Sequence, residues 1–140
     1  MSERVLPDTN VLGELWNPQG LDRVKQAFDR VADRVVLSVI VLGETFRGIG
    51  QLPQSRRRDR LDAYYRGIVR DHADAILPVS LQVAEAWGRL AATHRLRGRV
   101  LPPADGLIAA TALVHDLTLW TRNTADFDGT GVRLFDPWEA

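Results

Sequence analysis

Short apolar runs alternate with amphipathic segments along the chain. The runs are rich in Val, Leu and Ile, which is typical of strands buried on both faces, and the segments between them repeat apolar residues at helical spacing. The predicted strands are residues 5–6, 35–37, 76–79, 118–121 and 132–134, and the predicted helices cover 10–16, 21–31, 39–46, 56–72, 83–91 and 105–115. Residues 95–99 are predicted to form a basic loop. This alternation predicts an α/β fold with a short parallel sheet of about five strands flanked by helices.

The composition limits the class of protein. With 140 residues, 45% of them hydrophobic, the chain suits one domain with one core, spanning residues 1–140. It has no cysteine, which excludes disulfides, zinc-thiolate sites and a cysteine nucleophile. Residues 1–10 do not read as a signal peptide, and no apolar run reaches the ~18 residues that a membrane helix needs. We therefore expect a cytoplasmic protein without a membrane segment.

The charges balance, with 18 basic and 18 acidic residues. This balance excludes a strongly basic nucleic-acid coat and an acidic tail. Of the basic residues, 17 are arginine and only Lys25 is lysine. Arginine makes better bidentate contacts with carboxylate and phosphate, although codon bias in a GC-rich genome is the simpler explanation.

Four acidic residues follow the carboxyl ends of predicted strands, where the functional crevice of a parallel sheet lies. They are Asp8, Glu44, Asp105 and Asp126. Glu44 and Asp105 interrupt apolar segments, and an acid buried there must pair, become protonated or bind a cation. Oxygen ligands without His or Cys suit Mg²⁺ or Mn²⁺, and such ions lower the pKa of a water and stabilise displacement at phosphorus.

The other polar and aromatic residues give weaker signals. Arg95, Arg97, Arg99 and Arg122 are candidates for contacts with phosphate groups. The cluster of Arg56, Arg57, Arg58 and Arg60 is interrupted by Asp59, which favours a solvated helix face. His72, His94 and His115 are scattered, and we expect them at the surface or at helix ends. The four tryptophans are interpreted as core or dimer packing, although an exposed Trp16 would be able to stack a base.

The motifs, taken in order, resemble a known family. The stretches are LPDTNVL, SVIVLGETFRGI, LPPADGLIAATALVHDLTLWTRNTADF and LFDPW. They are similar to PIN-domain proteins of the VapC and FitB type, the toxins of type II toxin–antitoxin pairs. The resemblance runs from Val5 to Trp138 and implies a PIN-like three-layer fold and a metal-dependent ribonuclease.

The resemblance also assigns the site. It implies Asp8, Glu44, Asp105 and Asp126 as catalytic and metal-binding residues, with Thr9 and Asn123 as polar supports and Asp128 as the alternative fourth acid. They would hold Mg²⁺, or Mn²⁺, and a metal-activated water would hydrolyse RNA phosphodiester bonds. The implied partners are a small cognate antitoxin, the RNA substrate and a second copy in a homodimer, with DNA reached only through the antitoxin.

The chain departs from the family pattern at two positions, and two other functions compete with that of a ribonuclease. Pro7 replaces the usual apolar residue before the first acid and could tilt the strand end, while Gly43 loosens a helix by ~1 kcal/mol. A catalytically silent binding module that acts only within a complex is the alternative function. A haloacid-dehalogenase-type phosphatase is disfavoured, because Asn10 stands where that mechanism needs a second aspartate.

Overall fold

All five strands of the fold run parallel, but they form a sheet of three and a separate pair. The computed structural model describes residues 3–139. The strands are β1 (Val5–Pro7), β2 (Leu37–Ser38), β3 (Ile76–Leu77), β4 (Thr118–Trp120) and β5 (Arg133–Phe135). The order β1-β4-β5 makes one sheet and β2-β3 the other. A parallel bridge between Val5 and Val35 joins them, with the Val36 amide donating to the Val5 carbonyl at 2.8 Å.

A strand is present at each of the five predicted places, although β2 begins at Leu37 rather than at residue 35 and β3 ends at Leu77 rather than at residue 79. The prediction of one continuous sheet of about five strands is not confirmed. The difference arises because the strands are only two or three residues long, so that a single bridge is all that connects the two groups. Strands β1 and β4 lie at the centre and are buried throughout.

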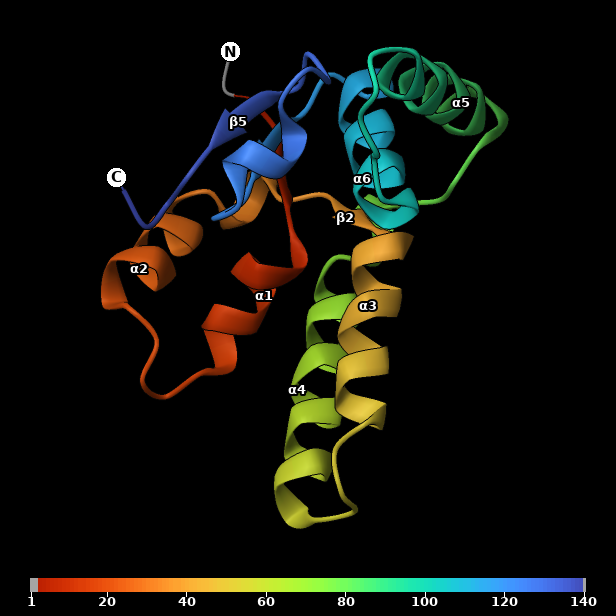
Figure 1. Cartoon of the computed structure of the whole chain (residues 1–140). Coiled ribbons are helices and arrows are strands. Elements are labelled where there is room, and N and C mark those ends of the chain that lie inside the picture. Colours follow the sequence, from red (N-terminus) through yellow and green to blue (C-terminus); the bar gives the residue numbers. More distant parts are fainter. Residues whose placement is uncertain (1–2, 140) are drawn as a thin grey trace.

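Six α-helices flank the strands in the described part of the chain, residues 3–139 (Figure 1). They are α1 (Thr9–Trp16), α2 (Asp22–Arg30), α3 (Val39–Gly50), α4 (Arg56–Asp71), α5 (Leu81–Leu96) and α6 (Pro103–Val114). Short 3₁₀ turns cover Ala32–Arg34, Ala73–Ala75 and Thr124–Phe127, the last of which is η3. Helix α3 lies beside α4, and α5 lies beside α6. None of these helices is long and apolar enough to cross a bilayer.

Helices α3 and α5 begin at serine caps. The Ser38 hydroxyl accepts from the Ile40 amide at 3.0 Å and the Ser80 hydroxyl from the Val83 amide at 3.2 Å, which satisfies amides that a helix start leaves free. Helix α5 extends to Leu96, so the prediction that residues 95–99 form a loop is wrong at Arg95 and Leu96. Helix α6 begins at Pro103 rather than at residue 105, since proline is well suited to the first turn.

Pro7 does not interrupt the pairing of β1 with β4. It lies in register with Trp120, and the next amide, that of Asp8, donates to the Trp120 carbonyl at 2.8 Å. Proline is tolerated at a strand end because its missing N–H is not needed there. The core beside it contains Leu6 and Leu119, both fully buried. The chain therefore leaves β1 into α1 along a well-packed path.

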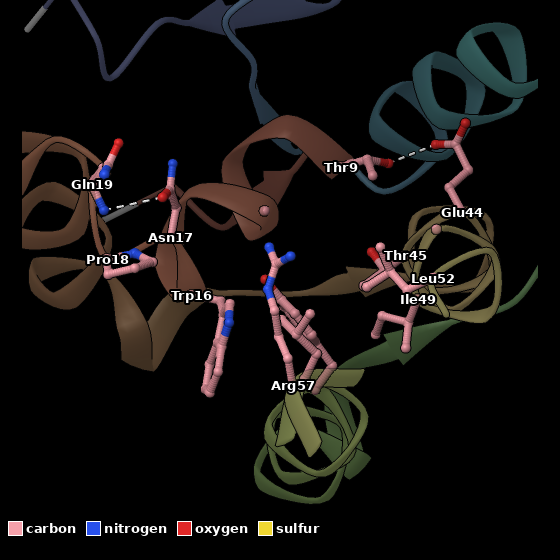
Figure 2. A pocket seen from close by; sticks show the side chains of 14 residues that line it. Thr9, Trp16, Asn17, Pro18, Gln19, Glu44, Thr45, Ile49, Leu52 and Arg57 are labelled. Atoms are coloured by element: carbon pink, nitrogen blue, oxygen red, sulfur yellow. Dashed lines mark hydrogen bonds between the residues drawn. The ribbon is translucent and has the colours of Figure 1, made fainter. Parts of the chain in front are cut away.

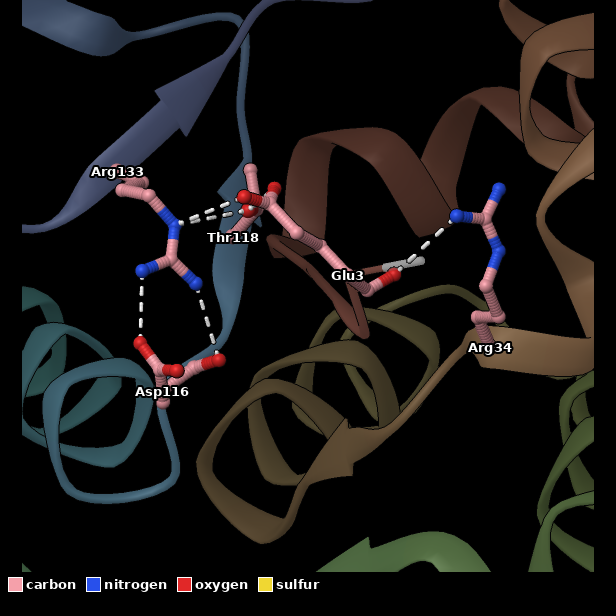
Figure 3. A network of polar contacts seen from close by, with 5 residues as sticks. All are labelled: Glu3, Arg34, Asp116, Thr118 and Arg133. Atoms are coloured by element: carbon pink, nitrogen blue, oxygen red, sulfur yellow. Dashed lines mark hydrogen bonds and ion pairs between the residues drawn. The ribbon is translucent and has the colours of Figure 1, made fainter. Parts of the chain in front are cut away.

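Opposite charges meet at the amino ends of the strands (Figure 3). The Arg133 guanidinium contacts the Asp116 carboxylate at 2.7 Å (Nη1 to Oδ1) and the Glu3 carboxylate at 3.4 Å (Nε to Oε1). The Thr118 hydroxyl donates to Glu3, and Arg34 donates to the Glu3 carbonyl at 3.4 Å. We call Glu3, Asp116, Thr118 and Arg133 the amino-end network.

Candidate functional site

Four carboxylates from four elements gather at the carboxyl ends of the central strands. Asp8 follows β1 and caps α1, Glu44 lies in the middle of α3, Asp105 is in the first turn of α6, and Asp126 belongs to η3. We call these four residues the acidic cluster. They are the four acids that the sequence singled out.

Asp8 is the most buried member of the cluster, with 7% of its surface exposed. Its Oδ1 accepts from the Thr9 amide at 2.8 Å, and its Oδ2 accepts from the Thr121 hydroxyl at 2.8 Å and the Asn10 amide at 3.4 Å. All three donors are neutral groups. They orient the carboxylate but leave its charge uncompensated.

Thr121 is a site residue that sequence reasoning missed. Its hydroxyl is fully buried, donates to Asp8, and accepts from the Asn10 side chain at 3.3 Å and the Asn123 amide at 3.1 Å. Sequence reasoning also missed Asn10, which it treated only as a residue that is not the second aspartate of a phosphatase and which here donates to Asp8. A signal was available: Thr121 directly follows β4, as Asp8 follows β1, and these two strands are neighbours.

Thr9 and Asn123, the two expected supports, lie differently. The Thr9 hydroxyl donates to Glu44 Oε1 at 2.6 Å and so links α1 to α3 (Figure 2). The Asn123 backbone amide donates to the Thr121 hydroxyl at 3.1 Å, while the residue itself is exposed. Thr9 is thus in direct contact with the acidic cluster, whereas Asn123 touches it through Thr121.

The carboxylates influence one another electrostatically. Burial, followed by the charges of Asp8, Asp126 and Glu44, raises the pKa of Asp105 to about 6. Burial also raises the pKa of Asp8, with added effects from Glu44 and Asp126, against hydrogen bonds from Thr121 and Thr9 that lower it. Like charges that shift each other's pKa must lie near each other. The charges of Glu44 and Asp126 act on both Asp8 and Asp105, so the four acids belong to one site.

The donor set of the cluster fits a hard divalent cation. Carboxylate oxygens without thiolate or imidazole ligands are what Mg²⁺ and Mn²⁺ prefer, and mutual repulsion is what a cation relieves. Within residues 3–139, no three Asp, Glu or His side chains are arranged so that they could hold one metal ion as they stand. The structure thus places the candidate ligands at one site but does not arrange them as a complete coordination sphere.

Close packing of α5 on α6 positions Asp105. Gly106 lies so near Trp87 that a Cβ atom there would be 2.7 Å from the Trp87 Cδ1 atom. Only glycine allows this approach without displacing the indole. Gly106, which follows Asp105 in the DGLIAATA stretch, therefore fixes the height of the first turn of α6 against α5.

The acidic cluster lies between two hollows. One, of about 560 Å³, is lined by His94, Arg99, Asp105, Asp126 and Asp128, among others. The other, of about 840 Å³, includes Thr9 and Glu44. Asp126 and Asp128 are both exposed in the first hollow, but among residues 3–139 it is Asp126, not Asp128, whose charge raises the pKa of Asp8 and Asp105.

The arginines expected to meet RNA are not all near the acids. Arg99 lines the hollow that holds Asp105 and Asp126. The Arg122 guanidinium lies 5.3 Å from the centre of the Trp138 ring, and its backbone amide donates to Asn10 at 3.2 Å. Arg95 and Arg97 are exposed at the end of α5 and in the turn after it.

His94 lies in the last turn of α5, as the prediction of a helix-end residue has it, but it is buried and lies beside the acids. Its side chain is 5% exposed, and it lines the hollow with Asp105. Its Nδ1 lies 3.0 Å from the Leu90 carbonyl oxygen and its Nε2 lies 3.3 Å from the Asp128 carbonyl oxygen. His94 therefore ties α5 to the loop that follows η3, a contact between residues too far apart in sequence to predict.

Fold and site together define an α/β protein with an acidic site at the carboxyl end of a parallel sheet. Residues 5–131 match the family model of the PIN domain. The chain belongs to the PIN-domain family, in its VapC and FitB toxin branch.

The relatives cover nearly the whole chain. The toxin FitB of Neisseria gonorrhoeae is 34% identical over 136 residues, 96% of this chain and 98% of that protein. A VapC ribonuclease of Sinorhizobium fredii is 31% identical over 137 residues, again 96% and 98%. Among solved structures, FitAcB from Neisseria gonorrhoeae superposes with a TM-score of 0.90 at 33% identity, covering 97% and 99%. FitAB bound to an IR36 DNA fragment gives 0.88 at 33% identity, covering 96% and 95%.

Proposed function

We propose that this protein is the toxin of a type II toxin–antitoxin pair and a metal-dependent ribonuclease that hydrolyses RNA phosphodiester bonds in the cytoplasm. The observation that carries the proposal is the convergence of four carboxylates at the carboxyl ends of the strands, none of which forms an ion pair within residues 3–139. Four carboxylates with no basic partner are costly unless a cation joins them. The VapC and FitB relatives support the same class of activity.

The acidic cluster would hold Mg²⁺, with Mn²⁺ as the alternative ion. When bound, the cation lowers the pKa of a water and offsets charge on the departing oxygen. Thr121 and Asn10 hold the Asp8 carboxylate in one orientation, and Thr9 does the same for Glu44. A carboxylate of the cluster accepts the proton of the water, whose oxygen bonds to phosphorus as the ester P–O bond breaks. No side-chain nucleophile is required.

The proposed partners are a small cognate antitoxin, RNA and a second copy of the chain. FitAB has been solved bound to a DNA fragment, which supports a complex of toxin and antitoxin that contacts DNA, and we propose that this contact is made through the antitoxin. An antitoxin arginine that reaches the acidic cluster would be the natural inhibitor, because guanidinium pairs with carboxylates in bidentate fashion. Arg99 and Arg122, at the margins of the cluster, are proposed to meet RNA phosphates, with Arg95 and Arg97 further out.

The experiment is Mg²⁺-dependent cleavage of a structured RNA by the purified protein. Asp8→Asn and Asp105→Asn should each lower the rate by about a thousandfold or more, because several kcal/mol of charge stabilisation are lost. Asp116→Asn, an acid at the opposite end of the sheet, is the matched control and should cleave normally. Cleavage that survives EDTA, or that is unaffected in both cluster variants, would overturn the mechanism.

Two further arms test the remaining assignments. Asp126→Asn should abolish cleavage while Asp128→Asn retains it, and the reverse result would make Asp128 the fourth acid. Calorimetry with Mn²⁺ tests the alternative of a silent binding module. A protein that binds no Mn²⁺ with all four acids intact would support that alternative.

A further inference from the structure

The larger hollow, which Glu44 helps to line, also contains aromatic and basic side chains that the proposed cleavage step does not involve. It lies between α1, α3 and α4 and has a volume of about 840 Å³. Its lining includes Trp16, Asn17, Gln19, Ile49, Arg57 and Tyr65 (Figure 2). We call it the Trp16 pocket. Its volume lies within the range of small-molecule sites, and its lining includes Thr9 and Glu44, so the pocket reaches one member of the acidic cluster.

The aromatic wall of the pocket is held in place. The Trp16 ring is half-buried and packs on Tyr64 with ring centres 5.1 Å apart. Tyr65, which also lines the pocket, donates its hydroxyl to the Leu12 carbonyl at 2.6 Å. A rigid aromatic surface beside an opening is the element that proteins use to stack an unpaired base.

A positive charge projects into the same space. In Figure 2 the Arg57 guanidinium extends from α4 toward α1, with Trp16 on one side and Ile49 on the other. Between residues 3 and 139 the basic side chains found in ion pairs are those of Arg66, Arg89 and Arg133, so Arg57 has no carboxylate partner there. An unpaired guanidinium next to an acidic site suits a ligand that carries its own negative charge.

We propose that the Trp16 pocket receives one unstacked nucleotide of the RNA substrate, next to the phosphodiester that is cleaved. The base lies against Trp16, and its phosphate meets Arg57. This inference rests on the proposed ribonuclease function and adds to it a specificity site for a single-stranded or looped RNA. Single-stranded RNA fits better than a duplex, because only an unpaired base can leave its stack to reach an aromatic wall. A segment of a partner protein is the competing occupant.

The test measures binding apart from cleavage. The protein carries Asp105→Asn to silence cleavage, and the probe is a fluorescein-labelled single-stranded RNA oligonucleotide followed by anisotropy. Arg57→Ala and Trp16→Leu should each raise the Kd about tenfold, within the range measured for loss of a stacked base. Arg57→Ala should also reduce the slope of log Kd against log salt by about 1, since one phosphate contact is lost, whereas Trp16→Leu should leave the slope unchanged.

Matched variants locate the effect. Arg60→Ala removes an exposed arginine of the same helix that is absent from the pocket lining, and should leave the Kd unchanged. Trp16→Phe keeps an aromatic face and should restore most of the binding lost in Trp16→Leu. Because Arg57 is exposed, Arg57→Ala should fold normally, and circular dichroism checks both Trp16 variants.

Each outcome is decisive. Equal weakening by Arg57→Ala and Arg60→Ala, or no weakening by Arg57→Ala and Trp16→Leu, would overturn the pocket. Variants that lose a purified antitoxin partner but keep RNA would overturn it in favour of a protein occupant. If the chain with all its acids does not cleave RNA, yet Arg57→Ala still weakens oligonucleotide binding and its salt slope, the proposed function fails while the nucleotide pocket stands.

Discussion

The two ends of the central strands treat charge in opposite ways. At the amino ends, Arg133 pairs with both Glu3 and Asp116, and the Thr118 hydroxyl donates to Glu3 (Figure 3). At the carboxyl ends, Asp8 is held by neutral donors, and no member of the acidic cluster forms an ion pair within the described residues. One end is electrostatically complete in the chain itself, and the other leaves negative charge for a ligand to balance.

One strand carries both arrangements. Thr118, at the start of β4, gives its hydroxyl to Glu3, and Thr121, directly after β4, gives its hydroxyl to Asp8. Both threonines are buried. The same residue type therefore serves an exposed ion-pair network at one end and a buried, uncompensated carboxylate at the other. A buried carboxylate without a basic partner departs from the pairing seen at the amino ends, and departures of this kind are expected at functional sites.

Among the changes that compare the two ends, the largest effect should come from removing the Thr121 hydroxyl at the carboxyl end. Thr121→Val keeps the shape of the side chain but deprives Asp8 of its shortest side-chain hydrogen bond, at 2.8 Å. We expect cleavage of a structured RNA to fall about 10- to 100-fold, the usual loss when a residue that orients a metal ligand is removed. Initial rates across a range of Mg²⁺ concentrations measure it, and higher Mg²⁺ should restore part of the activity.

Thr118→Val is the control for that comparison. It removes a hydroxyl from the other end of the same strand, so its cleavage rate should match that of the unaltered protein. A loss in Thr118→Val as large as that in Thr121→Val would mean that the effect comes from strand packing rather than from the orientation of Asp8.

The sequence predicted the strands and the acids for the same reason. Runs such as residues 35–37 are apolar throughout because both faces are buried, and a carboxylate directly after such a run stands out. Asp8 could be found in this way because its signal is local. The continuous five-stranded sheet could not be judged, because the strands are only two or three residues long and the groups meet at a single bridge.

The residues that escaped prediction depend on distant partners. Thr121 matters because Asp8, 113 positions away, accepts its hydrogen bond. Gly106 matters because Trp87 occupies the space a side chain would need. His94 is buried because the Asp128 carbonyl and the adjoining loop cover it. The sequence gives little sign that such a polar or small residue is important, because its role depends on a contact with a residue that is distant in sequence.

The second effect concerns stability, and it should favour the variant. Asp105 has a pKa of about 6 in the fold against an ordinary value of 3.8, so its ionised form opposes folding above pH 6. Asp105→Asn should therefore stabilise the metal-free protein at neutral pH. The shift sets an upper bound of about 3 kcal/mol, and solvent screening of this half-buried side chain reduces the expected gain to about 1 kcal/mol.

The pH dependence fixes the sign. As the pH falls from above 6 toward 4, the folded protein takes up a proton that the unfolded chain does not, so its stability should rise relative to that of Asp105→Asn. Urea unfolding in EDTA at neutral pH and near pH 4 measures both proteins. Mg²⁺ at neutral pH should stabilise the unaltered protein by mass action. An Asp105→Asn protein that is less stable than the parent at neutral pH would show that the acidic cluster is not under repulsion.

The smallest effect should come from breaking the amino-end network. Arg133→Ala removes both ion pairs, but the arginine is exposed and salt screens such pairs, so thermal unfolding should shift down slightly at low salt and hardly at all at high salt. RNA cleavage should be unchanged, because Thr118 and Arg133 begin their strands, whereas Asp8 of the acidic cluster follows the end of β1. If Arg133→Ala lowered cleavage as much as Thr121→Val, the two ends would be coupled through β4, and the division between a stabilising end and a functional end would not hold.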